Sequence, residues 1–164
     1  MRVALAITSH ERPDALGAVL ASVLRQRVKP DEIVIADDGS GVATRKVIDD
    51  FLGKSPAPAR LVSQPHEGFR VAGLRNLAIA SATSGYIVFI DGDMLLHPEF
   101  IADHLRIARP GPYTQGVRVL ADEGLTRELI SSEGSWPRPS AHGLGLLRRA
   151  YLLHSPVISA LSSR

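Results

Sequence analysis

The chain has 164 residues, of which 22% are charged and 45% hydrophobic, a balance typical of a globular domain rather than of a disordered chain. The absence of cysteine excludes disulfides, thiolate metal sites and cysteine nucleophiles. No apolar run reaches the roughly 18 residues that a membrane helix needs, and the apolar start of the sequence is too short for a signal peptide. We therefore expect a cytoplasmic protein of one domain.

The formal net charge of +2 is divided unevenly along the chain. Residues 1–103 hold 11 Lys and Arg against 13 Asp and Glu, whereas residues 104–164 hold 8 against 4. This positive second part suits an anionic substrate, or a peripheral contact with the acidic inner face of a membrane, although a solvated surface is the more common reason for such an excess. No block of Lys and Arg alternates with aromatic residues, so we expect no nucleic-acid partner.

Short aliphatic runs alternate with amphipathic segments along most of the chain. In chain order the pattern predicts a strand at residues 3–8, a helix opened by Pro13, a strand at 32–36, a helix at 44–52, a strand at 60–63, a helix at 72–82, a strand at 86–90, a helix opened by Pro98 and a strand at 113–120. Weaker patterns predict helices at 125–130 and 144–153.

This alternation of strands and helices predicts an α/β fold, a mainly parallel sheet with helices on both faces. We take residues 1–120 as the α/β domain and residues 121–164 as a helical or irregular extension of it. Ligands of such folds bind at the carboxyl ends of the strands. Two acidic turns follow predicted strands there, Asp37-Asp38 and Asp91-Gly92-Asp93.

Asp91 and Asp93 follow the most apolar of the predicted strands. Crowded carboxylates repel one another, and a hard cation such as Mg²⁺ or Mn²⁺ relieves this repulsion while it bridges to phosphate oxygens. An isolated turn of this kind more often caps a helix, so its place after a buried strand is what favours metal binding. The turn at Asp37 and Asp38 has two open interpretations, an exposed Asx turn or an acceptor for a nucleobase imide or a ribose hydroxyl.

Four ordered segments resemble family 2 glycosyltransferases: VALAITSHERP at 3–13, EIVIADDGS at 32–40, GLRNLA at 73–78 and GYIVFIDGD at 85–93. The resemblance implies the A-type glycosyltransferase fold, the Rossmann-like fold of nucleotide-diphospho-sugar transferases. It also implies a metal-dependent, inverting transfer of a sugar from a nucleotide-sugar donor, a UDP-sugar in first place, to a glycan or lipid-linked acceptor. Mn²⁺ or Mg²⁺ would neutralise the leaving phosphates.

The resemblance also implies roles for residues of the first half. Thr8 and Glu11 match positions that line the nucleotide pocket. Asp37 matches the aspartate that contacts the base, and Asp38 adjoins it near the ribose. His10 departs from the aromatic residue that the family commonly has there, which leaves open how the base is stacked.

Further roles fall on the acidic turn and on the helix before it. Asp93 matches the usual metal ligand, and Asp91 matches a residue that faces the donor sugar or ribose and is a second candidate ligand. Arg75 matches a basic residue near the nucleotide or donor sugar, and Arg70 is a further candidate for a phosphate or sugar contact. These residues complete the substrate-binding and metal-binding set that the resemblance implies.

The resemblance ends before a general base is found. Members of the family are longer than this chain, and their second half supplies an acidic base, often in a Glu-Asp pair. Glu133 is the candidate here, while Trp136 is either a sugar platform or a packing residue. The alternative to an enzyme is a truncated or non-catalytic nucleotide-sugar-binding domain, and exposed apolar residues left by a missing half would favour a homodimer. A nucleotidyltransferase is disfavoured because residues 8–13 contain no glycine.

Overall fold

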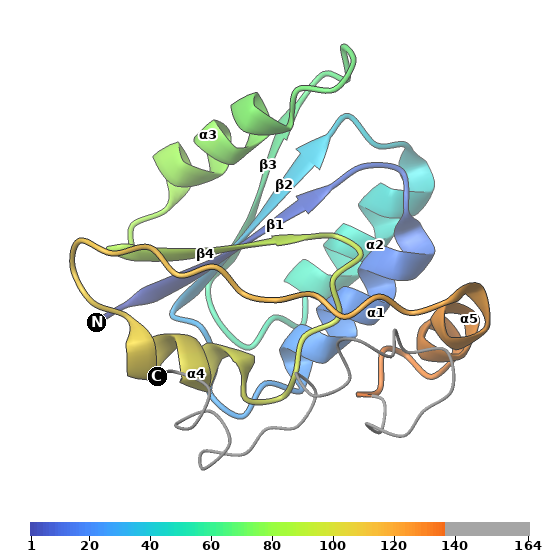
Figure 1. The fold of residues 1–164 in the computed structure, drawn as a ribbon. Helices are drawn as coiled ribbons and strands as arrows, with labels where there is room; N and C mark the ends of the chain where they lie inside the picture. Colours follow the sequence, from blue (N-terminus) through green and yellow to red (C-terminus); the bar gives the residue numbers. More distant parts are fainter. Residues whose placement is uncertain (137–164) are drawn as a thin grey trace.

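A computed structural model describes residues 1–136 and contains one parallel sheet flanked by helices (Figure 1). The strands lie in the order β3-β2-β1-β4, and each neighbouring pair is parallel. This confirms the predicted sheet type. In chain order the elements are β1 (Val3–Ser9), α1 (Pro13–Leu24), β2 (Glu32–Asp38), α2 (Val42–Leu52), β3 (Ala59–Gln64), α3 (Val71–Ser81), β4 (Tyr86–Asp91), α4 (Phe100–Ile107) and α5 (Glu123–Ser131).

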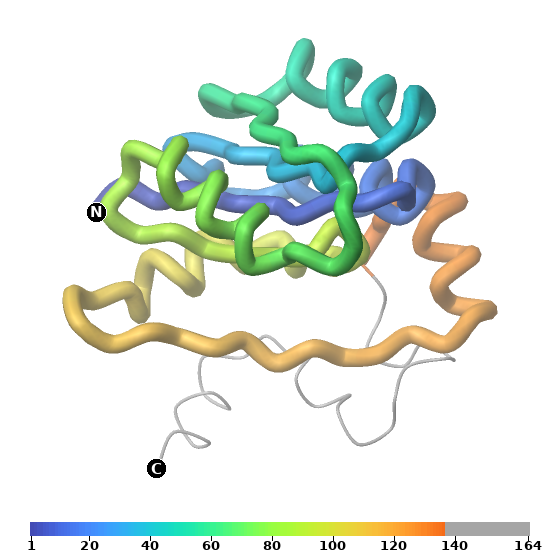
Figure 2. The backbone as a smooth tube through the Cα atoms, turned by 90° about the horizontal axis from the view of Figure 1, so that it is seen from above, coloured from blue at the N-terminus to red at the C-terminus, as the bar shows by residue number. Residues whose placement is uncertain are grey.

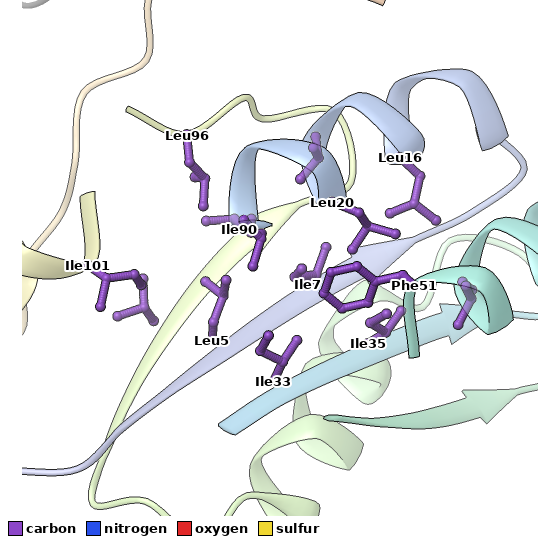
Figure 3. Packing of buried hydrophobic residues seen from close by; sticks show 14 of the residues in the cluster. Leu5, Ile7, Leu16, Leu20, Ile33, Ile35, Phe51, Ile90, Leu96 and Ile101 are labelled. Atoms are coloured by element: carbon purple, nitrogen blue, oxygen red, sulfur yellow. The ribbon is translucent and has the colours of Figure 1, made fainter. Parts of the chain in front are cut away.

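Helices cover both faces of the sheet because side chains of each strand alternate between the two faces. One set of buried side chains joins the sheet to α1, α2 and α4, and Figure 3 shows the ring of Phe51 beside Ile7 and Ile35 within it. The strands contribute odd-numbered residues on β1 and β2 to this larger core, among them Leu5, Ile7, Ile33 and Ile35.

The opposite face carries a smaller core under α3. Ala6, Val34 and Ala36 from the strands meet Leu74 and Ala78 of the helix there. The strand residues are small, so α3 lies close to the sheet. This division by odd and even positions decides which side chains at the strand ends point toward α3.

A buried carboxylate joins the elements at the amino ends of the strands. Glu32 opens β2 and is 1% exposed, and its oxygens accept hydrogen bonds from Arg60 Nη1 at 2.8 Å, Thr83 N at 2.8 Å and Ser84 N at 2.6 Å. Burial alone would raise the pKa of Glu32, but the hydrogen bonds from Ser84, Arg60 and Thr83 outweigh it and lower the pKa to about 2. Glu32 therefore stays ionised and ties β3 and the start of β4 to β2.

The predicted strand at 113–120 is wrong. These residues form neither a strand nor a helix, and Figure 2 shows the chain after α4 running in an extended stretch along the β4 side of the sheet toward α5. Tyr113, Val117 and Leu120 are exposed, so the alternating pattern reflects an extended chain whose apolar side chains are not covered by another element in the described residues.

The remaining elements follow the predictions closely. Pro13 begins α1, and Asp122 caps α5 by accepting a hydrogen bond from Leu125 N at 2.9 Å. The predicted helix at 144–153 lies outside the described residues. None of the helices in residues 1–136 is long and apolar enough to span a membrane.

Candidate functional site

A cavity of 490 Å³ opens at the carboxyl ends of the strands, beside α3. Asp38 and Asp91 end β2 and β4, and Thr8 lies one residue before the end of β1. Each stands two residues beyond a side chain that faces α3. Because side chains alternate between the two faces along each strand, these three polar side chains point to the same face of the sheet. The full lining is Thr8, Ser9, His10, Arg12, Asp38, His66, Phe69, Val71, Leu74, Arg75, Asp91, Gly92, Asp93 and Arg118.

Asp38 forms the β2 side of the cavity. Gln64 Nε2 donates to its Oδ1 at 2.6 Å, and His66 Nδ1 lies 2.7 Å from its Oδ2. The hydrogen bond from Gln64 lowers the pKa of Asp38 most, burial opposes this change, and His66 lowers the pKa further. His10 stacks on His66 with 4.2 Å between ring centroids. A carboxylate that is ionised and partly enclosed can accept hydrogen bonds from a ligand.

Asp91 forms the β4 side and is surrounded by donors. Its Oδ1 accepts hydrogen bonds from Thr8 Oγ1 at 3.1 Å and from Arg75 Nη2 at 3.0 Å, and Arg118 Nη1 lies 4.0 Å from its Oδ2. Arg75 Nε is buried without a hydrogen-bond partner in the described part of the chain, as is Ser9 Oγ. Two residues of the cavity wall therefore have unused polar atoms that a ligand can satisfy.

Asp93 differs from Asp91 in its surroundings. It is exposed, lines the cavity, and has no hydrogen bond or ion pair with any residue in 1–136. Gly92 brings this turn close to β1, because a Cβ at this position would lie 2.8 Å from the Thr8 carbonyl oxygen. An exposed carboxylate beside a partly neutralised one fits Mg²⁺ or Mn²⁺, which take one or two protein carboxylates together with phosphate oxygens.

Asp37 and Glu11, both predicted to contact the nucleotide, do not line the cavity. Asp37 is 0% exposed, and it accepts a hydrogen bond from Ser40 N at 3.0 Å and pairs with Arg45 at 3.6 Å. Glu11 accepts a hydrogen bond from Gly41 N at 2.6 Å. In this structure both residues hold the turn between β2 and α2. The acids that share the cavity are Asp38, Asp91 and Asp93.

Three other candidates also lie outside the cavity wall. Arg70 donates to the Pro65 carbonyl at 2.9 Å and pairs with Glu67, so its charge is used within its own loop. The main-chain carbonyl of Glu133 accepts a hydrogen bond from Arg25. Arg25 follows the carboxyl end of α1, which is the end of this helix away from the cavity. Trp136 packs edge-on against His97 with 4.9 Å between ring centroids. Of the two roles considered for this residue, a sugar platform or a packing residue, this contact corresponds to packing.

His66, Arg12 and Phe69 line the cavity, although no role was predicted for them from the sequence. His66 lies two residues after the end of β3, so its place after a parallel strand was a usable signal. Phe69 is 93% exposed although it lines the cavity. Arg12 precedes α1, where only the folded turn shows which way it points. No motif surrounds His66, which is recognised through its position after a strand end.

Solved structures with the same fold include nucleotide-sugar transferases. The structure of Staphylococcus aureus TarS 1-349 in complex with UDP matches with a TM-score of 0.58 and 19% identity, over 65% of this chain and 31% of that one. The mannosyltransferase PcManGT of Pyrobaculum calidifontis, solved with GDP-Man and Mn²⁺, matches with a TM-score of 0.59 and 19% identity, over 87% of this chain and 42% of that one. These likenesses show the A-type glycosyltransferase fold.

The model of glycosyl transferase family 2 matches residues 5–155, and the chain belongs to this family. Validoxylamine A glucosyltransferase of Streptomyces hygroscopicus subsp. limoneus is 30% identical over 112 residues, which are 67% of this chain and 24% of that protein. Hyaluronan synthase of Pasteurella multocida is 27% identical over 150 residues, 88% of this chain and 14% of that protein. The chain therefore spans less than a third of the length of these curated relatives.

Proposed function

We propose that this chain binds a nucleoside diphosphate sugar in the cavity and transfers the sugar, with inversion, to a glycan or lipid-linked acceptor. The observation that carries the proposal is the convergence of Asp38, Asp91 and Asp93 on one cavity that also holds Arg12 and Arg75. Carboxylates can accept hydrogen bonds from a base or a ribose, and arginines can pair with phosphates. The mixed charge therefore suits a ligand that has both parts.

Each end of the cavity supports one part of this ligand. Asp38 offers an ionised acceptor for an imide N–H or a hydroxyl, with His10 and Phe69 as flat surfaces nearby. Arg75 lies beside Asp91 with a buried Nε that has no partner in the described residues, so a phosphate oxygen can take this donor. UDP and GDP-Man in the similar structures support a nucleotide donor, and we infer a UDP-sugar in first place.

Asp93 is the residue that we assign to the divalent cation, Mn²⁺ or Mg²⁺, with Asp91 as a second ligand. Asp93 is exposed, whereas Asp91 already compensates Arg75. When bound, such a cation supplies Lewis-acid stabilisation of the charge on the leaving diphosphate. The protein itself orients the donor through Asp38 and holds the acidic turn against Thr8 through Gly92.

A second candidate function is donor binding without transfer. In the reaction, the anomeric C–O bond to the diphosphate breaks, a bond to the acceptor oxygen forms, and a base takes the hydroxyl proton. Within residues 1–136, the carboxylates of the cavity wall are the three that we assign to donor and metal, and Glu133 is not among them. This observation favours a module whose base comes from elsewhere.

Calorimetric titration with UDP, GDP and dTDP in the presence of Mn²⁺ tests donor binding. We expect UDP to bind in a Mn²⁺-dependent manner, and Asp93→Asn to weaken this binding by about tenfold or more. Asp50→Asn is the matched control, because Asp50 is an exposed acid of α2 whose contact is an ion pair with Lys46. Absence of binding to all three nucleotides would overturn the proposal.

Turnover distinguishes the two candidate functions. Release of UDP from a UDP-sugar, abolished by Asp93→Asn, supports the transferase. Metal-dependent binding of UDP without release from any UDP-sugar in a panel, with glycan and lipid-linked acceptors present, supports the donor-binding module.

A further inference from the structure

Two histidines and an aspartate converge at the β2 end of the cavity. His66 Nδ1 lies 2.7 Å from Asp38 Oδ2, and His10 Nδ1 lies 2.9 Å from the Asp38 main-chain oxygen. One ligand atom from each of the three side chains lies within 4.8 Å of the other two. The residues come from the loop after β1, the end of β2 and the loop after β3, so folding alone brings them together.

We propose that His10, Asp38 and His66 form a site for a transition-metal dication, Zn²⁺ in first place, that is separate from the Asp91 and Asp93 pair. Two imidazole nitrogens and one carboxylate oxygen are a ligand set that Zn²⁺ accepts, whereas Mg²⁺ and Mn²⁺ prefer oxygen ligands. Three protein ligands leave a fourth position of a tetrahedral ion open to water or another small ligand.

The surroundings of Asp38 prepare it for this role. Gln64 holds Oδ1 at 2.6 Å, which orients the carboxylate and leaves Oδ2 directed at His66. Gln64 thus acts as the outer partner that fixes a metal-binding carboxylate. The opposing side chains can adjust, since the His66 side chain is 43% exposed and His10 is also exposed.

Metal binding requires a small rearrangement of the rings. Tetrahedral Zn²⁺ with bonds of about 2.0–2.1 Å places its ligand atoms about 3.3 Å apart, so the three atoms move by about 1.5 Å or less. The stacked imidazoles of His10 and His66, now 18° from parallel, tilt apart so that each directs a lone pair at the ion. A neutral imidazole achieves this by carrying its proton on the other ring nitrogen.

The site does not overlap with the acidic turn at the other end of the cavity. Asp38 ends β2 and Asp91 ends β4, and β1 lies between these strands. Strands two positions apart in a sheet are separated by about 10 Å, which is more than one ion can bridge. The Zn²⁺ site and the nucleotide-dependent cation are therefore distinguishable by mutation. Asp38 and His10 also face the nucleotide end of the donor cavity, so bound Zn²⁺ and the nucleotide should exclude each other, and each is titrated in the absence of the other.

Titration of Zn²⁺ into the metal-free full chain tests the site, with Co²⁺ absorption as a spectroscopic probe of tetrahedral nitrogen and oxygen ligation. We expect one equivalent to bind, and His66→Ala and His10→Ala each to weaken binding by about tenfold or more. Asp93→Asn is the matched control and should leave the Zn²⁺ affinity within about twofold, as should a large excess of Mg²⁺. Thermal unfolding of the metal-free variants checks that they fold, with His66→Gln replacing His66→Ala if the latter does not.

Three results would overturn the proposal: no Zn²⁺ binding, unchanged binding in the folded histidine variants, or a loss in Asp93→Asn as large as in the His66 variant. None of them bears on the proposed transfer reaction, which depends on UDP binding with Mn²⁺. Zn²⁺ binding without UDP binding would support this site and contradict the proposed function, and the converse result would do the opposite.

Discussion

Asp37 and Asp38 are consecutive residues at the end of β2 whose side chains lie on opposite faces of the sheet. Asp37 follows Ile33 and Ile35 toward α2 and pairs with Arg45, whereas Asp38 follows Val34 and Ala36 toward α3 and lines the cavity. One carboxylate therefore stabilises a turn while its neighbour is available to a ligand.

The first prediction separates these two roles. Asp37→Asn should lower the free energy of unfolding by about 2 kcal/mol, because both carboxylate oxygens accept from Ser40 whereas the amide has one acceptor oxygen, and because the charge that pairs with Arg45 is lost. Asp38→Asn should weaken UDP binding by about tenfold with a smaller loss of stability. Urea unfolding and UDP titration of both variants measure the two effects. Equal losses of stability in the two variants would contradict the assignment.

The second prediction concerns Glu32 and acid stability. The pKa of Glu32 is lowered from 4.5 to about 2 in the folded protein, so its carboxylate stabilises the fold fully above pH 4.5. This contribution should fall as the pH decreases from 4.5 toward 2, because in this range the unfolded chain takes up a proton on Glu32 while the folded state keeps the carboxylate ionised. Urea unfolding at a series of pH values measures it.

Replacement of Glu32 checks the same prediction. Glu32→Gln should cost about 2–3 kcal/mol at pH 7, since the charged acceptor of Arg60 and Thr83 is lost from a buried position. The variant should also lose part of the pH dependence between 4.5 and 2. Glu128→Gln, at an exposed position on α5, is the matched control and should change neither quantity. A stability curve of Glu32→Gln with the slope of the unmodified protein would refute this role.

The alternation of side chains along a strand is sufficient to predict that Asp38 faces α3 and the cavity, although the resemblance assigned the contact with the base to Asp37. Alternation along residues 32–38 places Val34, Ala36 and Asp38 on one face, and Thr8 and Asp91 follow the same rule on β1 and β4. The parallel direction of the strands and the positions of their ends were predictable, because short aliphatic runs alternate with amphipathic segments in the sequence.

Other parts of the site depend on the folded loops. The end of β3 indicates that His66 lies near the cavity, but the local sequence does not show that its ring contacts Asp38, or that Arg70 binds its own loop instead of the cavity. The stretch at 113–120 has the alternating pattern of a strand, yet its apolar residues remain exposed in the described structure. An alternation of apolar and polar residues indicates an extended chain. Whether that chain pairs as a β-strand depends on the position of a neighbouring strand.

The third prediction concerns Phe69. Its side chain is 93% exposed and lines the cavity, so it contributes little to the fold and offers a flat surface to a base or a sugar. Phe69→Ala should weaken binding of the nucleotide sugar by about 1 kcal/mol and leave the thermal midpoint nearly unchanged. Tyr113→Ala is the matched control, because Tyr113 is an aromatic residue that is 89% exposed and does not line the cavity. Equal binding by the two variants would contradict a ligand contact at Phe69.

The last prediction tests how closely the acidic turn must approach β1. A Cβ at Gly92 would lie 2.8 Å from the Thr8 carbonyl oxygen and 3.6 Å from Ser9 Cα, and both are backbone atoms that cannot rotate away. Gly92→Ala should therefore push Asp91 and Asp93 out of position, with a loss of about 1–3 kcal/mol in stability and a weaker Mn²⁺-dependent binding of UDP.

Gly85→Ala is the control for this last substitution, since a Cβ there has no neighbour within 4 Å. It introduces the same methyl group just before β4 and should leave both stability and UDP binding nearly unchanged. If Gly92→Ala bound UDP and Mn²⁺ as tightly as Gly85→Ala, the turn could bind its ligand without close contact to Thr8. The acidic pair would then owe its position to the ion pair between Asp91 and Arg75 rather than to the backbone at Gly92.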